Sequence, residues 1–198
     1  MFTGIIQAIG RIAELKPANQ TAAVVIDAGG LDLGDVAIGD SIACNGVCLT
    51  VTRLTKTNFS VDVSHETLRV TAGFTSGAAI NLEKSLRLAD RLGGHLVSGH
   101  VDGVGTVTAV KPVDGNREIT VRFSAELGRY IARKGSITVN GVSLTVNAVT
   151  IDTFSVNLIP HSLAVTNLRD LEQGDRVNLE IDLVARYVER MFDRDDQR

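Results

Sequence analysis

Short runs in which hydrophobic and polar residues alternate dominate the chain. The runs are rich in Val, Ile, Thr and Phe, and Gly, Asn and Asp separate them. Alternation with a period of two is typical of strands with one buried face, and short strands at regular intervals are typical of small barrels and sandwiches. The pattern predicts strands at 9–15, 22–27, 47–54, 58–63 and 78–83 in the first half, and at 103–110, 117–123, 142–149, 153–159 and 175–181 in the second.

Helical periodicity is confined to two segments. Residues 125–135 carry Leu127 and Ile131 four positions apart and end at Gly135, which predicts a short helix. The tail from Asp182 predicts a second, amphipathic helix, whose apolar stripe consists of Leu183, Val184, Tyr187, Val188, Met191 and Phe192. Such a stripe either packs back on its own domain or mediates self-association, and we favour self-association.

The two halves of the chain repeat one another. The stretch NGVCLTV at 45–51 recurs as NGVSLTV at 140–146, and the same offset of 95 positions aligns TGIIQAIG at 3–10 with SGHVDGVG at 98–105. A constant, domain-sized offset indicates duplication of one fold, because solenoid repeats are far shorter. The sequence therefore predicts two tandem domains.

Composition and charge exclude several classes of protein. The net charge of −3 and the lack of a Lys/Arg cluster interleaved with aromatic residues argue against a nucleic-acid partner. Residues 1–15 contain neither a basic segment nor a long apolar run, so we expect neither a signal peptide nor a membrane span. On one extended strand Cys44 and Cys48 would lie roughly 13 Å apart, too far for a disulfide, and two cysteines alone make no zinc site. These features predict a cytoplasmic protein.

One difference inside the repeated motif carries candidate chemistry. Cys48 in the first copy stands where the second copy has Ser143, and each is followed two residues later by a threonine, Thr50 or Thr145. Side chains two apart on a strand share a face. Either Cys48 is a small buried hydrophobic residue, or a thiol and a hydroxyl line two similar sites that handle related ligands differently.

The segment GGHLVSGHV at 93–101 carries a second asymmetry. It contains His95 and His100, and His100 aligns with Ile5 of the first half. Histidine transfers protons near neutral pH, although a structural role is equally open for both residues. A metal pair is disfavoured, because no third histidine or carboxylate stands at ligand spacing. The residues alone therefore predict a duplicated β-barrel binder with two similar but unequal sites.

Five motifs together resemble a known family. MFTGII, NGVCLTV, GGHLVSGHVDGVG, NGVSLTV and LIPHSL, in this order and at these separations, are similar to riboflavin synthases of the alpha-chain type, which contain two lumazine-binding repeats. The resemblance covers the whole chain. It implies an all-β fold of two tandem six-stranded antiparallel Greek-key barrels plus a C-terminal α-helix that holds a homotrimer. The implied parts are the first barrel with its linker at 1–94, the second barrel at 95–182 and the trimerisation helix at 183–198.

The resemblance also implies a reaction. Two molecules of 6,7-dimethyl-8-ribityllumazine dismutate by transfer of a four-carbon unit, and the products are riboflavin and 5-amino-6-(D-ribitylamino)uracil. This transferase reaction is the last step of riboflavin biosynthesis and uses no metal, flavin or nicotinamide cofactor. The active site forms between the first barrel of one subunit and the second barrel of a neighbour, and lumazine synthase is a candidate pathway partner. The alternative is a non-catalytic antenna protein of the same fold that binds lumazine or flavin.

Site residues follow from the resemblance position by position. The first ligand would lie against Gly4, Ile5, Ile6, Cys48, Leu49, Thr50, Asp62, Val63, Ser64, His65, Glu66 and Thr67. The second would lie against Gly99, His100, Val101, Lys134, Ser143, Leu144, Thr145, Asn157, Leu158, Ile159, Pro160, His161 and Ser162.

Four of the implied residues are candidates for catalysis. Phe2 would order the N-terminal segment over the ligands, and His100 would transfer the proton of the acidic C7 methyl group. Cys48 would assist addition at C7, and Ser41 would hydrogen-bond the ring or the ribityl chain. Asn140 stands where the family often carries Asp, which we interpret as a changed detail of the site.

Overall fold

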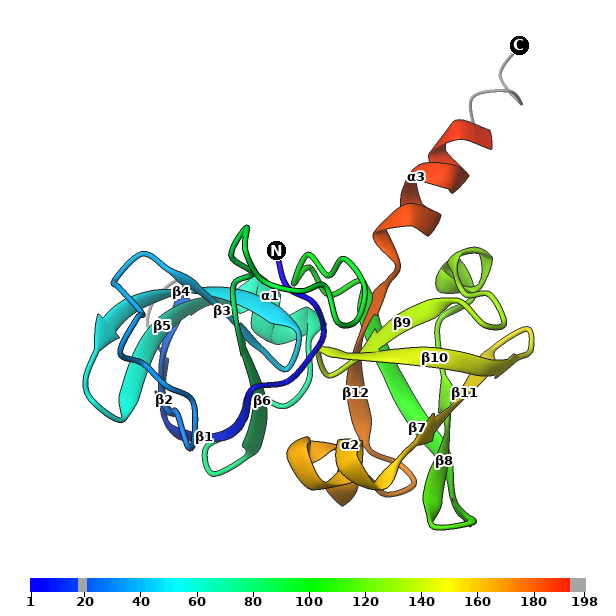
Figure 1. The fold of residues 1–198 in the computed structure, drawn as a ribbon, viewed down its shortest axis with the longest axis horizontal. Coiled ribbons are helices and arrows are strands. Elements are labelled where there is room, and N and C mark those ends of the chain that lie inside the picture. The colour runs from blue at the N-terminus through cyan, green and yellow to red at the C-terminus, as the bar shows by residue number, and fades with distance from the viewer. Residues whose placement is uncertain (18–20, 193–198) are drawn as a thin grey trace.

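The computed structural model of the chain describes residues 1–17 and 21–192, and there the strands form two closed antiparallel barrels side by side (Figure 1). The first barrel has the order β1-β2-β5-β4-β3-β6 and consists of β1 (Ala8–Pro17), β2 (Thr21–Asp27), β3 (Ser41–Cys44), β4 (Val47–Leu54), β5 (Asn58–Ser64) and β6 (Ala79–Lys84). The second has the order β10-β11-β8-β7-β12-β9 and consists of β7 (Gly103–Val113), β8 (Asn116–Arg122), β9 (Ser136–Val139), β10 (Val142–Val149), β11 (Thr153–Leu158) and β12 (Arg176–Ile181). In each barrel a long connection leads from the second strand to three strands that are joined by hairpins, which is the Greek-key arrangement. The predicted fold class is confirmed.

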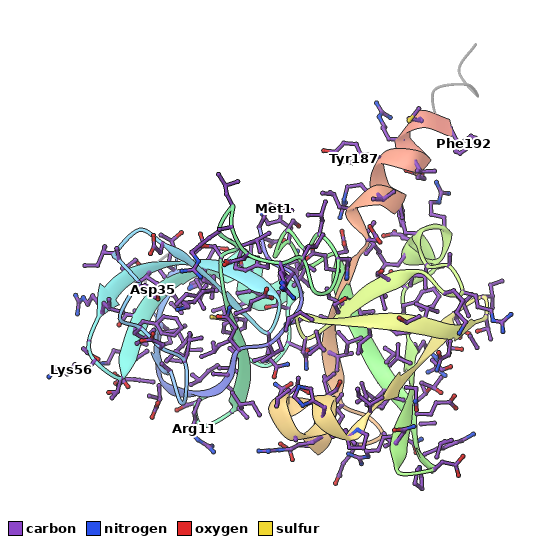
Figure 2. All side chains as sticks on the ribbon, viewed as in Figure 1. Met1, Arg11, Asp35, Lys56, Tyr187 and Phe192 are labelled. Atoms are coloured by element: carbon purple, nitrogen blue, oxygen red, sulfur yellow. The ribbon has the colours of Figure 1, made fainter. Side chains whose placement is uncertain are left out.

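Each barrel has its own core, because inward-facing positions alternate with outward-facing ones along the strands. Phe59 of β5 and Phe154 of β11 occupy equivalent central positions, and each is about 1% exposed. Side chains fill both interiors (Figure 2). Burying an aromatic or branched aliphatic side chain of this kind contributes roughly 1.5–3 kcal/mol. Each copy of the sequence repeat therefore forms a barrel with its own hydrophobic core.

The irregular elements differ from the sequence-based expectation. The helix predicted at 125–135 is only the short 3₁₀ helix η1 (Ala125–Tyr130), since Gly128 and Gly135 disfavour a longer α-helix. Two short helices lie outside the predicted set, α1 (His65–Val70) and α2 (Pro160–Val165), and a second 3₁₀ helix, η2 (Asn167–Asp170), follows α2. The Ser64 hydroxyl caps α1 by accepting a hydrogen bond from the Thr67 N–H at 2.9 Å.

Strands β3 and β9 also lie outside the predicted set, and β3 changes the placement of the cysteines. Cys44 ends β3 and Cys48 belongs to β4, with a two-residue turn between them, so the assumption that both occupy one strand is wrong. Cys44 is buried in the core of the first barrel, whereas Cys48 lies on the outer face. Both thiols are free. The chemistry open to the two residues therefore differs.

The two Asn–Gly turns meet back to back between the barrels. Asn45 and Gly46 join β3 to β4, and Asn140 and Gly141 join β9 to β10. All four residues have positive φ, between 47° and 81°, as two-residue hairpin turns require. A Cβ on Gly46 would lie 2.8 Å from the Gly141 nitrogen, so no larger residue fits without a shift of the backbone.

Buried asparagines join the turns across the interface. The Asn178 side-chain N–H donates to the Asn45 carbonyl oxygen at 3.0 Å, and the Asn81 side chain donates to the Asn140 carbonyl oxygen at the same distance. Within each barrel, the side-chain oxygen of the turn asparagine accepts a hydrogen bond from the backbone N–H of Asn81 or Asn178. Asn140 is therefore a structural residue of the interface between the barrels.

Helix α3 (Leu183–Phe192) leaves the second barrel after β12 and projects away from both barrels (Figure 1). Polar contacts fix its base: Arg186 pairs with Asp102 at 2.5 Å, and Glu189 accepts hydrogen bonds from Arg129 and Tyr130. Apart from half-buried Leu183, its apolar stripe stays exposed, with Tyr187 and Phe192 clear of the barrels (Figure 2). The alternative in which the stripe packs on its own barrel is therefore wrong. Among the described residues, no helix is long and apolar enough to cross a membrane.

Gly46→Ala and Gly77→Ala separate the cost of a left-handed backbone from the cost of a steric clash at a turn glycine. Gly77 also has a positive φ, 85°, but an added Cβ there meets no atom within 4 Å. We expect Gly77→Ala to lower the free energy of unfolding by about 1 kcal/mol, the cost of a left-handed backbone. Gly46→Ala should lower it by roughly 2–4 kcal/mol, because the Gly141 backbone must also move. Urea denaturation measures both, and equal losses would contradict the close contact between the turns.

Candidate functional site

The segment that precedes each barrel crosses to the other barrel. Residues 2–6, the N-terminal crossing segment, precede β1, and the Gly4 carbonyl accepts a hydrogen bond from the Ser143 N–H of β10 at 2.8 Å. Residues 97–101, the linker crossing segment, precede β7, and the Gly99 carbonyl accepts a hydrogen bond from the Cys48 N–H of β4 at 2.8 Å. Ile6 accordingly packs against the second core and Val101 against the first.

This exchange corrects the grouping of the predicted site residues. We expected Gly4, Ile5 and Ile6 beside Cys48, and Gly99, His100 and Val101 beside Ser143. The structure places the first group on the second barrel and the second group on the first. The offset of the repeat is identical for both groupings, so the alignment could not distinguish them.

Glycine is required where each crossing segment meets its strand. Gly4 has a φ of 75°, and a Cβ there would lie 2.6 Å from the Ser143 Cβ. Gly99 has a φ of 80°, and a Cβ there would lie 2.6 Å from the Cys48 Cβ. Both the conformation and the close approach need a residue without a side chain.

A buried carboxylate of the barrel that follows each crossing segment in the sequence holds that segment. Glu83 of β6 accepts the Thr3 N–H at 2.7 Å and the Thr3 hydroxyl at 2.6 Å on one oxygen, and the Gly4 N–H at 2.9 Å on the other. Glu180 of β12 accepts the equivalent three bonds from Ser98 and Gly99, at 2.6, 2.6 and 3.0 Å. Burial raises the pKa of both carboxyl groups, and the hydrogen bonds oppose this shift.

Phe2 anchors the start of the N-terminal crossing segment. Its side chain is fully buried against Ala43 and Val97, and half-buried Cys48 packs against this cluster. Its backbone exchanges two hydrogen bonds with Val97, at 2.8 and 3.1 Å. Phe2 therefore fixes the start of the N-terminal crossing segment.

His95 and Ser143 form a close polar pair beside the N-terminal crossing segment. The His95 Nδ1 and the Ser143 hydroxyl oxygen are 2.7 Å apart, and the His95 N–H donates to the Thr3 carbonyl oxygen at 3.1 Å. His95 Nε2 is buried and has no hydrogen-bond partner among the described residues. Burial lowers the pKa of His95, while the charge of Asp182 acts in the opposite direction. The neutral imidazole is therefore favoured.

The remaining predicted residues divide into outward-facing and core positions. Thr50, Thr145, Ser41 and half-buried Cys48 and Ser143 share the outer faces of the strands, and Ser41 lies directly opposite Thr50. Side chains that are exposed or half-buried also include those of Ile5, Asp62, Ser64, His65, Glu66, Thr67, His100, Lys134, Asn157, Ile159, Pro160, His161 and Ser162. Core side chains are those of Leu49, Val63, Leu144 and Leu158, so only their backbones can face a ligand.

Glu83 and Glu180 are the residues that sequence reasoning missed. Both end the stretch NLE, which occurs at 81–83 and again at 178–180. A buried glutamate at equivalent positions of two strands is unusual, because charged residues are rarely fully buried without partners. The recurrence of NLE in both halves was the sequence signal that could have identified these two glutamates.

The fold and the site define a tandem binder with two related faces, one bearing Cys48 and the other Ser143. The sequence matches the family described as "Lumazine binding domain" over residues 3–85 and 98–182, which is the class of tandem lumazine-binding proteins. Among the residues that the structure describes, no group of three or more His, Cys, Asp or Glu could hold a metal ion.

Curated relatives are similar over nearly the full length. The riboflavin synthase of Photobacterium phosphoreum is 45% identical, over 97% of this chain and 89% of its own. The riboflavin synthase of Brucella abortus is 44% identical, over 96% and 98%. The crystal structure of LumP complexed with riboflavin has a TM-score of 0.84 and 27% identity, over 91% of this chain and 99% of that chain. The chain belongs to the riboflavin synthase family, and the resemblance seen in the motifs is confirmed.

The lowered pKa of His95 predicts a pH dependence of stability. A histidine whose pKa is lower in the folded state stabilises the fold fully above its unfolded pKa, near 6.5, and this contribution is lost as the pH falls through the folded value. We expect the free energy of unfolding to fall more between pH 7.5 and 5 in the unmodified protein than in His95→Asn. Urea titrations at both pH values measure this difference.

Ser143→Ala is the matched control. It removes the partner of His95 Nδ1 but leaves the imidazole buried, and burial is the main cause of the shift. The control should keep most of the pH dependence. A pH dependence that His95→Asn leaves unchanged would contradict the neutral buried imidazole.

Proposed function

We propose that this chain catalyses the dismutation of two molecules of 6,7-dimethyl-8-ribityllumazine to riboflavin and 5-amino-6-(D-ribitylamino)uracil. The observation that carries the proposal is the pair of equivalent faces, of which one bears Cys48 where the other bears Ser143. A reaction that uses two copies of one substrate in unlike roles needs two similar sites with different chemistry. Full-length similarity to riboflavin synthases supports the same reaction.

The crossing segments determine which candidate side chains lie at the same ligand site. We assign one ligand to the face of the first barrel that carries Ser41, Cys48 and Thr50, with residues 99–101 beside it. The exchange brings Gly99 onto Cys48, so His100 from the second half joins the Cys48 site. The thiol and the proton-transferring imidazole then serve the same ligand, where His100 acts on the C7 methyl proton and Cys48 assists addition at C7.

We assign the other ligand to the face of the second barrel that carries Ser143 and Thr145. There Gly4 and the exposed Ile5 take the places of Gly99 and His100, and His95 contacts the Ser143 hydroxyl. This site offers hydrogen bonds and no exposed imidazole at the equivalent position. Holding two planar rings face to face contributes through orientation, which is worth roughly 7–11 kcal/mol in favourable cases.

Both faces are open to solvent in the single chain, because Thr50 and Thr145 are exposed. Proton abstraction and carbon transfer proceed better where water is excluded. We therefore propose that the first barrel of one subunit meets the second barrel of a neighbour within a homotrimer. The exposed stripe of α3 supplies an apolar contact of the kind that such an assembly buries.

The proposal includes the division of the chain and its location. We assign the first barrel and linker to 1–94, the second barrel to 95–182 and the assembly helix to 183–198, whose last six residues lie outside the described part. The two free thiols support a reducing, cytoplasmic location.

The reaction is tested directly with 6,7-dimethyl-8-ribityllumazine. We expect the purified protein, with no metal or cofactor added, to form one riboflavin for every two lumazines consumed, measured by chromatography. Tight binding of the lumazine without product would instead identify a non-catalytic antenna protein.

Disruption of the α3 stripe tests the assembly. Val188→Asp and Met191→Asp place a charge on the exposed apolar face, whereas Arg190→Ser changes an exposed residue that is already polar. We expect the two aspartate variants to sediment as monomers and to lose most of their activity, and Arg190→Ser to remain assembled and active. A monomeric variant with full activity would sink the proposal that the site forms between subunits.

A further inference from the structure

In the hydrogen bonds that the structure describes, two buried carboxylates accept only from N–H and O–H groups of the crossing segments. Glu83 is 3% exposed and Glu180 is 2% exposed, and both oxygens of each accept hydrogen bonds. An ionised carboxylate is purely an acceptor, and N–H and O–H donors form stronger bonds to it than to a neutral oxygen. The three donors of each segment therefore match the ionised form.

These carboxylates are costly if stability alone is considered. Burial disfavours the charged form, and the raised pKa of both groups reflects that cost. Ile80 and Leu82 of β6 point into the barrel core and are apolar and fully buried, whereas Glu83 lies on the opposite face of the strand, toward the N-terminal crossing segment. An apolar side chain at position 83 would suit the strand equally well but would leave the Thr3 and Gly4 donors unpaired.

Each carboxylate acts on the barrel to which it does not belong. Glu83 belongs to the first barrel, but Gly4, which it holds, lies on Ser143 of the second barrel. Glu180 belongs to the second barrel, but Gly99, which it holds, lies on Cys48 of the first barrel. The hydrogen bonds thus run from the last strand of one barrel, through a crossing segment, to the site face of the other.

We propose that Glu83 and Glu180 are positioning residues, and that each builds the ligand site on the opposite barrel by ordering a crossing segment. Glu83 serves the site with Ser143, and Glu180 serves the site with Cys48. The inference rests on the two sites assigned above, yet the order of the segments exists without any ligand. Its structural test is therefore independent of the reaction.

Glu83→Gln and Glu180→Gln are the direct variants. Glutamine has the same shape, but its NH₂ group is a donor and meets N–H groups that need an acceptor. One charge-assisted acceptor is therefore lost. Amide hydrogen exchange of the ligand-free protein, read by NMR, follows the N–H groups of Ser143 and Cys48. In Glu83→Gln we expect the Ser143 N–H to exchange roughly tenfold faster or more, with the Cys48 N–H unchanged. In Glu180→Gln we expect the reverse.

Three further variants complete the test. Glu126→Gln, at an exposed site in η1, controls for the substitution itself and should change neither amide. Thr3→Ala and Ser98→Ala remove one donor to Glu83 or Glu180 without altering a barrel strand, and they should give the same crossed pattern in a weaker form if a glutamine variant fails to fold. Faster exchange on the same barrel as the substitution, or no change at either amide, would overturn the proposal.

Kinetics separate this inference from the proposed reaction. If the protein dismutates lumazine, both glutamine variants should lose at least about tenfold in kcat/KM, and each should still bind one equivalent of riboflavin at the site left intact. Two equivalents bound with the affinity of the unmodified protein by either variant would overturn the positioning role. Failure of the unmodified protein to form riboflavin, together with a crossed exchange pattern, would reject the reaction but support the positioning role.

Discussion

The contact between the two Asn–Gly turns determines how every other part of the molecule is placed. Gly46 and Gly141 approach so closely that neither has space for a Cβ, and buried asparagines bond the turns across the interface. The bonds use neutral amides, which satisfy one another in a buried interface without an uncompensated charge. With the barrels fixed in this way, each crossing segment is long enough to reach the face of the other barrel.

A symmetric scaffold thus presents asymmetric chemistry. The turns, the asparagines, the glycines at 4 and 99 and the glutamates at 83 and 180 are the same in both halves. At the assigned ligand sites, Cys48 stands against Ser143 and His100 against Ile5, and His95 contacts the Ser143 hydroxyl. Because the scaffold is shared, the difference between the two sites arises from a few side chains and not from the backbone.

The duplicated barrels could be predicted from the sequence, because period-two alternation and a constant offset are local or periodic signals. β3 and β9 could not, since four-residue strands are too short to show alternation, and without β3 the cysteines were placed on one strand. The exchange of crossing segments escaped prediction for another reason: the offset is identical whether a segment serves its own barrel or the other. The interface role of Asn140 escaped prediction because its partners, Asn81 and Asn178, are distant in sequence.

The exchanged segments also bear on how such a chain could arise. Two barrels that each lend an N-terminal arm to the other have the geometry of a domain-swapped dimer, in which identical subunits trade one element around a twofold axis. In this molecule the exchange takes place within one chain, where Gly4 meets Ser143 and Gly99 meets Cys48 through equivalent hydrogen bonds. Once two copies of a gene are fused, each arm can mutate separately, and a homodimer with two equal sites can become a single polypeptide with two specialised ones.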